Sequence, residues 1–146
     1  MRQLREFIES TQRESYEDAM EFELDVIPSF CDAIGVDQDN LYFHPAIAEG
    51  KRTDAMVAAE PSKEPWAIVE AVYSDRRYIL KTGEMKAKEI VDQAGAEYGI
   101  LIGIGYLWVN SSHGTYSTNI RSATDSELSG IENVLTQSDP FPDGNI

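Results

Sequence analysis

The sequence predicts an α/β protein with a central mixed β-sheet flanked by helices. Segments with helical periodicity alternate with short apolar segments of strand length, in the order helix, three strands, helix, strand, hairpin, helix. One strand segment, residues 66–73, is apolar on both faces, which is typical of a strand covered on both sides. A chain of 146 residues is long enough to bury a core of this kind.

The first helix is expected between Thr11 and Gly35. Thr11 and Glu14 have the spacing of a capping box, which marks a helix start, and Gly35 suits a helix stop. Pro28 lies inside this segment and is expected to kink the helix or divide it in two. Apolar residues recur on one helix face, and Glu23 lies on that same face. A shorter extra helix is expected before this one.

Three strands are expected next. LYFHPAI (residues 41–47) contains a proline, which suits an edge strand or a bulge. TDAMVAA (53–59) and WAIVEAVY (66–73) are joined by the turn PSKEP (61–65). Since the connection is short, we expect these two strands to pair as a hairpin.

The second half of the chain is expected to contain a helix, a buried strand, a hairpin and a last helix. These elements cover, in that order, residues 82–98, 99–104, 106–110 with 115–120, and a stretch that begins after Thr124. We expect residues 1–137 to form a single domain and residues 138–146 to form a flexible tail.

Composition narrows the class of protein. The chain has one cysteine, Cys31, so an internal disulfide cannot form, which fits a reducing compartment. The first residues lack the apolar core of a signal peptide, and the longest apolar stretch, residues 98–109, is too short to cross a bilayer. We therefore expect a cytoplasmic protein with no membrane partner.

The net charge of −14 is the strongest bulk signal. Such a charge repels nucleic acids and anionic membranes. However, eight of the 12 basic residues fall between positions 51 and 88, so acidic regions surround a much less acidic segment. The charge is either ordinary solvated surface or an adaptation to high salt. We favour the second interpretation, under which molar salt screens charges within about 3 Å.

Three acids form the strongest candidate site: Glu23, Asp54 and Glu70. Glu70 interrupts an apolar strand, where an ionised carboxylate is costly unless a base, a raised pKa or a metal ion compensates it. The expected hairpin brings Asp54 towards Glu70, and three carboxylates suit Mg²⁺ or Mn²⁺. The alternative is that Asp54 ends a strand in solvent while Glu70 pairs with Arg76 or Arg77. Both interpretations remain open on spacing alone.

These motifs resemble the PD-(D/E)xK nuclease superfamily, and most closely the N-terminal nuclease domain of type I restriction enzyme motor subunits and their stand-alone relatives. The resemblance covers about residues 14–120. It rests on four stretches: ELDVIPSFCDAIGVD, Lys51-Arg52-Thr53-Asp54, Glu70-Ala71-Val72 and GILIGIGYLWVN. It implies a restriction-endonuclease-like fold and the hydrolysis of DNA phosphodiesters with Mg²⁺ or Mn²⁺. By this resemblance Asp54 and Glu70 are catalytic and bind the metal, with Glu23 as a third ligand.

The chain departs from the family pattern at one position. The motif lysine is replaced by Val72, which raises the question of where the catalytic cation comes from. Some members supply it from the following helix; we assign this role to Lys81 and keep three other donors open, Arg76, Lys86 and Lys88. Basic residues around the site are expected to contact nucleic acid: Lys51, Arg52, Arg76, Arg77, Lys86 and Lys88.

Two functions remain open on these grounds. The first is a metal-dependent nuclease with a nucleic-acid partner, DNA. The second is a catalytically inactive nuclease-fold module for nucleic-acid binding or protein interaction, which Val72 favours. A homodimer is compatible with either function.

Overall fold

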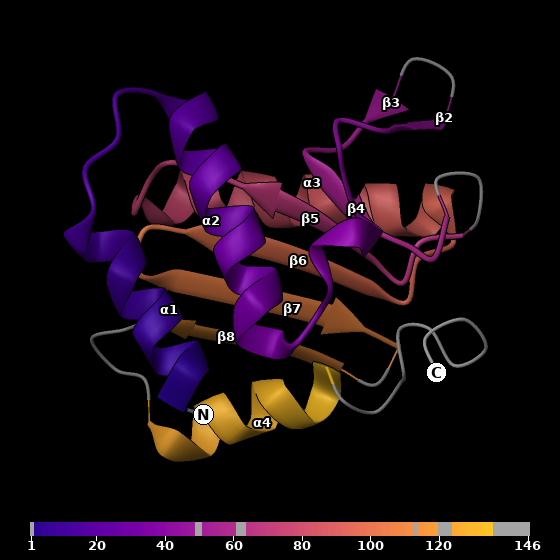
Figure 1. Cartoon of the computed structure of the whole chain (residues 1–146). Coiled ribbons are helices and arrows are strands. Elements are labelled where there is room, and N and C mark those ends of the chain that lie inside the picture. The colour runs from indigo at the N-terminus through magenta and orange to yellow at the C-terminus, as the bar shows by residue number, and fades with distance from the viewer. Residues whose placement is uncertain (1, 49–50, 61–63, 113, 120–123, 136–146) are drawn as a thin grey trace.

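The structure, a computed structural model, describes residues 2–48, 51–60, 64–112, 114–119 and 124–135. Four helices flank a six-stranded mixed sheet (Figure 1). In sheet order, the strands are β1 (Leu41–Phe43), β4 (Ala55–Val57), β5 (Ala67–Ala71), β6 (Tyr98–Gly103), β7 (Tyr106–Ser111) and β8 (Gly114–Asn119). A separate two-stranded sheet contains β2 (Ala46–Ala48) and β3 (Lys51–Arg52). The helices are α1 (Arg2–Arg13), α2 (Ala19–Ile34), α3 (Arg77–Ala94) and α4 (Asp125–Leu135), with a 3-10 turn η1 (Gln38–Asn40) after α2.

The sheet combines antiparallel hairpins with one parallel pair. β4 and β5 pair antiparallel, with Ala55 opposite Val69, as the sequence predicts for this hairpin. β5 and β6 are parallel and are connected through α3, as expected for two strands joined by a helical crossover. The sheet is therefore mixed, and the α/β class predicted from the sequence is confirmed.

The core has two layers, one on each face of the sheet. Residues of α1, α2 and α4 pack with Val69, Ile100 and Val109 on one face. Residues of α3 pack with Ile68 and Leu101 on the other. Since successive strand residues point to opposite faces, the doubly apolar segment is covered on both sides, as expected.

The N-terminal part differs from the prediction. α2 begins at Ala19 with Asp18 as its N-cap, so the start expected at Thr11 is wrong. Thr11 lies instead in α1, where its hydroxyl donates to the carbonyl of Ile8 and accepts the amide hydrogen of Gly105. Long-range packing thus uses the hydroxyl that the local pattern assigned to a cap. α2 runs unbroken past Pro28, so the proline does not divide it.

Two further boundaries shift. The segment LYFHPAI is two strands, because the chain leaves β1 at His44, whose φ is 50°, and enters β2 after Pro45. α3 begins at Arg77, and Thr82 lies inside it, with its hydroxyl bonded to the carbonyl of Tyr78. At its far end α3 stops at Ala94, before the expected boundary. The expected cap of α4 is confirmed, since Thr124 accepts the amide hydrogen of Glu127.

Some expectations fall outside the described residues. These are the start of the PSKEP turn (61–63) and the tail (138–146). Among the described helices, none combines the length and the apolar character that a membrane crossing requires.

Candidate functional site

The three predicted acids lie together where α2 meets the ends of β4 and β5. Glu23 is buried on α2, Asp54 immediately precedes β4, and Glu70 is buried inside β5. The hairpin between β4 and β5 brings Asp54 beside Glu70, as the spacing predicts. The cluster therefore joins a helix and two strands that are separate in the sequence.

Glu70 is held by three donors. The Thr53 hydroxyl and the Asp54 amide each donate to Glu70 Oε2 at 2.7 Å, and Lys86 Nζ lies 2.8 Å from Glu70 Oε1. The side chain of Glu70 is only 4% exposed, and these bonds compensate the cost of burying its charge. Thr53, itself buried, was not singled out from the sequence.

Asp54 has a half-buried carboxylate that lies next to another acid, Glu23. Its Oδ2 accepts the amide hydrogen of Ala71 at 2.9 Å. Burial, followed by a hydrogen bond with Glu23, raises the pKa of Asp54 to about 6, although the Ala71 amide and Lys86 act in the opposite direction. The neighbouring acid makes a negative charge on Asp54 costly, and a bound cation would remove that cost.

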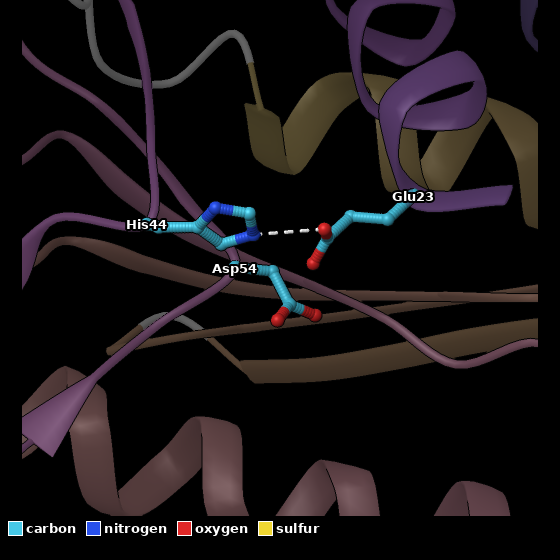
Figure 2. A group of neighbouring side chains, drawn as sticks. All are labelled: Glu23, His44 and Asp54. Atoms are coloured by element: carbon cyan, nitrogen blue, oxygen red, sulfur yellow. Dashed lines mark hydrogen bonds and ion pairs between the residues drawn. The ribbon is translucent and has the colours of Figure 1, made fainter. Parts of the chain in front are cut away.

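His44 completes a group with Glu23 and Asp54. Figure 2 shows the imidazole pointing towards the Glu23 carboxylate, and His44 Nε2 lies 2.9 Å from Glu23 Oε2. One ligand atom from each of the three residues lies within 4.8 Å of the others, so the group could hold a metal ion. A search for histidines or cysteines at metal-ligand spacing does not find this group, because the partners of His44 are the carboxylates Glu23 and Asp54. The available signal was the histidine-proline pair that interrupts a strand segment.

Lys86 brings a cation to the acids from α3. Its ammonium group contacts Glu70, and this hydrogen bond is the first cause of the raised pKa of Lys86. The side chain is 56% exposed, so the ammonium group contacts solvent as well as the cluster. Val72 instead packs beside Gly83 on α3, among apolar side chains. Among Lys81 and the three other donors kept open, Lys86 is the one for which the described residues show a contact with Glu70.

Lys81, the expected catalytic lysine, lies elsewhere on α3. It lines a pocket of about 400 Å³ together with Arg77, Glu84 and Tyr106, whose hydroxyl donates to Glu84 Oε2 at 2.7 Å. Because Glu84 and Lys86 are two residues apart, they project from nearly opposite sides of the helix. The pocket and the acid cluster are therefore different sites.

The remaining basic candidates lie in β3 and at the start of or within α3. Arg52 is exposed, and its Nη1 donates to the carbonyl of His44 at 3.1 Å. Arg76, Arg77 and Lys88 are exposed at the start and along the length of α3. The backbone of Lys51 lies in β3, whereas its side chain is outside the described part of the chain. The role of all these residues in nucleic-acid contact stays a prediction.

No protein-family model, curated protein or solved structure matches this chain. The function therefore has to be argued from the chemistry of the cluster. Carboxylate oxygens and an imidazole nitrogen are ligands for divalent metal ions, and an ammonium group beside them can stabilise negative charge.

Proposed function

We propose that this chain is a divalent-metal-dependent nuclease with a restriction-endonuclease-like fold that hydrolyses DNA phosphodiesters. One observation carries the proposal: Lys86 Nζ lies 2.8 Å from Glu70 Oε1, at the acid whose motif lacks its lysine. Lys86 thus supplies from α3 the cation that the motif lacks beside Glu70. The order of elements, with a β4–β5 hairpin and a parallel β6 reached through α3, also supports the fold.

The donor set fits a divalent ion. Asp54 and Glu23 are close enough to share one, and the raised pKa of Asp54 indicates that their negative charges are poorly compensated. Mg²⁺ and Mn²⁺ both bind such oxygen ligands. When bound, the ion supplies Lewis-acid polarisation of a phosphate and a more acidic water.

Other residues of the chain would position the lysine, stabilise negative charge and contact the DNA. Thr53 and the Asp54 amide fix one oxygen of Glu70, so that the other oxygen can hold Lys86. An ammonium group in this position stabilises the negative charge that develops on a phosphate oxygen. The exposed basic residues Arg52 and Arg76 would contact the DNA backbone, whereas Lys88, two residues after Lys86, projects from nearly the opposite side of α3.

The proposal is tested by cleavage of supercoiled plasmid DNA with Mg²⁺ or Mn²⁺, from low to molar salt. Wild-type protein should cut, and Asp54→Asn should lose activity. Lys86→Met should be slower by about 100-fold, the usual effect of removing one transition-state donor. Lys81→Met is the matched control and should stay within about threefold.

The opposite ranking of the two lysine variants would transfer the catalytic role to Lys81. If neither ion supports cleavage at any salt concentration, the proposed nuclease activity is wrong. The alternative function, an inactive module for nucleic-acid binding or protein interaction, is favoured by Val72 and by the engagement of both Glu70 oxygens. An absence of cleavage would therefore favour this alternative function.

A further inference from the structure

The group of Glu23, His44 and Asp54 contains a nitrogen donor that the proposed mechanism does not use. We propose that His44 is a metal ligand and that it sets the metal preference of the site, which takes Mn²⁺ or another transition-metal ion ahead of Mg²⁺. This inference rests on the proposed function for the presence of a catalytic ion. It adds the identity of a ligand and the class of ion.

The spacing of the donor atoms suits one ion. His44 Nε2 and Glu23 Oε2 are 2.9 Å apart, and the three ligand atoms lie within 4.8 Å of one another. Adjacent ligands of an octahedral ion with bonds of about 2.1 Å are about 3 Å apart, and opposite ligands are about 4 Å apart. The group therefore needs only small side-chain adjustments to bind an ion.

The backbone holds His44 in place. Its φ of 50° is in the left-handed region, which is uncommon for a residue other than glycine. The amide of His44 donates to the carbonyl of Asp54 at 2.9 Å, and its carbonyl accepts from Arg52 Nη1 at 3.1 Å. Asp54 and Arg52 thus hold the backbone of His44, and its imidazole points towards the Glu23 carboxylate (Figure 2).

The charges around His44 favour a cation. The Glu23 side chain is 8% exposed, and Asp54 is half-buried beside it. Lys86 pairs with Glu70, so among the described residues it balances one of the three carboxylates. A divalent cation between Glu23 and Asp54 would compensate the other two, and a neutral imidazole can share its coordination.

The mixed donor set discriminates between ions. Mg²⁺ is a hard ion that prefers oxygen and water ligands, whereas imidazole suits transition metals. Mn²⁺ accepts both kinds of ligand. Glu70, by contrast, is engaged by Thr53, the Asp54 amide and Lys86, so we assign it to positioning the lysine instead of to the metal.

The test uses the full chain, stripped of metal with a chelator and studied without DNA. Calorimetric titration gives the affinities for Mn²⁺ and for Mg²⁺, and pulsed electron paramagnetic resonance of the Mn²⁺ form detects a directly bound nitrogen. His44→Asn removes the imidazole and keeps a residue that tolerates the left-handed backbone. His113→Asn is the matched control, because His113 is the second histidine of the chain. Circular dichroism verifies that both variants are folded.

A nitrogen coupling is expected in the wild type and in His113→Asn, and it should disappear in His44→Asn. The same variant should lose at least about tenfold in Mn²⁺ affinity, while its Mg²⁺ affinity changes little. The inference is overturned if the wild type shows no nitrogen coupling, or if His44→Asn weakens both ions equally. Neither readout involves DNA. If the protein binds Mn²⁺ through a nitrogen ligand but does not cut DNA, the proposed nuclease activity is refuted and the assignment of His44 as a ligand is not.

Discussion

The contact between Lys86 and Glu70 is a pairing of two side chains with different exposure. Glu70 is 4% exposed and Lys86 is 56% exposed. Removing Lys86 leaves the buried Glu70 carboxylate without its cation, so the substitution affects the fold as well as the chemistry. The cleavage rate of the Lys86→Met variant should therefore be compared with that of wild type under conditions in which both proteins are equally folded. Circular dichroism measures the folded fraction of each.

Asp54 is expected to destabilise the metal-free protein above neutral pH. Its pKa is about 6 in the fold and 3.8 ordinarily, so the folded state binds this proton more tightly than the unfolded state. The stabilisation due to this proton is present below the ordinary pKa and is lost as the pH rises through about 6. Asp54→Asn should therefore be more stable than wild type at pH 8, by about 1–2 kcal/mol after allowance for partial exposure.

Urea denaturation in the presence of a chelator measures this difference. Near pH 4 the two proteins should be equally stable, because wild-type Asp54 is then mostly protonated when folded. Equal stability at pH 8 would contradict the raised pKa. A gain in stability that accompanies a loss of DNA cleavage would also show that the inactive variant is folded.

Glycines bring α3 close to the sheet. A Cβ at Gly99 would lie 2.7 Å from Val91 Cγ2, and a Cβ at Gly103 would lie 2.4 Å from Leu80 Cδ2. Glycines on the strand thus let the helix lie close to β6. Gly83 does the same from the helix side, where a Cβ would lie 2.9 Å from Leu101 Cδ1. The reach of Lys86 to Glu70 depends on this packing distance.

Gly83→Ala should therefore lower the stability, although alanine is the better helix former. The gain in helix propensity is about 1 kcal/mol, and the cost of overpacking is typically about 1–3 kcal/mol even though Gly83 itself is only partly buried. We expect a net loss of about 1 kcal/mol, and slower cleavage because α3 is displaced from Glu70. In a Leu101→Ala background the substitution should be tolerated better, since the contacting methyl group is gone. Strictly additive effects in urea denaturation would argue against the contact.

Considered as a whole, the chain has a charge of −14 and a core divided between two faces of one sheet. Repulsion between surface acids should destabilise the compact state at low salt. Its range falls from about 10 Å at 0.1 M salt to about 3 Å at 1 M. The free energy of unfolding should therefore rise with added salt.

Cys31 supplies a probe for this measurement. It is fully buried on α2, and burial raises the pKa of its thiol to about 12. The thiol should react with a disulfide reagent at pH 8 only when the protein unfolds. Labelling across a urea gradient should then give a midpoint that increases from 0.1 to 1 M NaCl. A midpoint that falls or stays constant would contradict the predicted adaptation to salt.

The order of strands and helices could be predicted because it depends on local periodicity. The doubly apolar β5 and the short turn after β4 predicted a hairpin that could bring Asp54 beside Glu70, and the structure shows this contact. Helix boundaries were less predictable. The Thr11 hydroxyl could cap a local helix or accept the Gly105 amide, and only the packing of α1 against the sheet decided between them.

By itself, the sequence determined the α/β class, since hydrophobic periodicity sets which face of an element is buried, and it offered the meeting of Glu23, Asp54 and Glu70 as one of two interpretations. Only the tertiary structure decided that the Lys86 ammonium group and the His44 imidazole join these acids. Lys86 reaches Glu70 because α3 lies close over β5, and His44 reaches Glu23 because a left-handed residue ends β1. Both contacts depend on distances between elements, and spacing along a chain does not encode such distances.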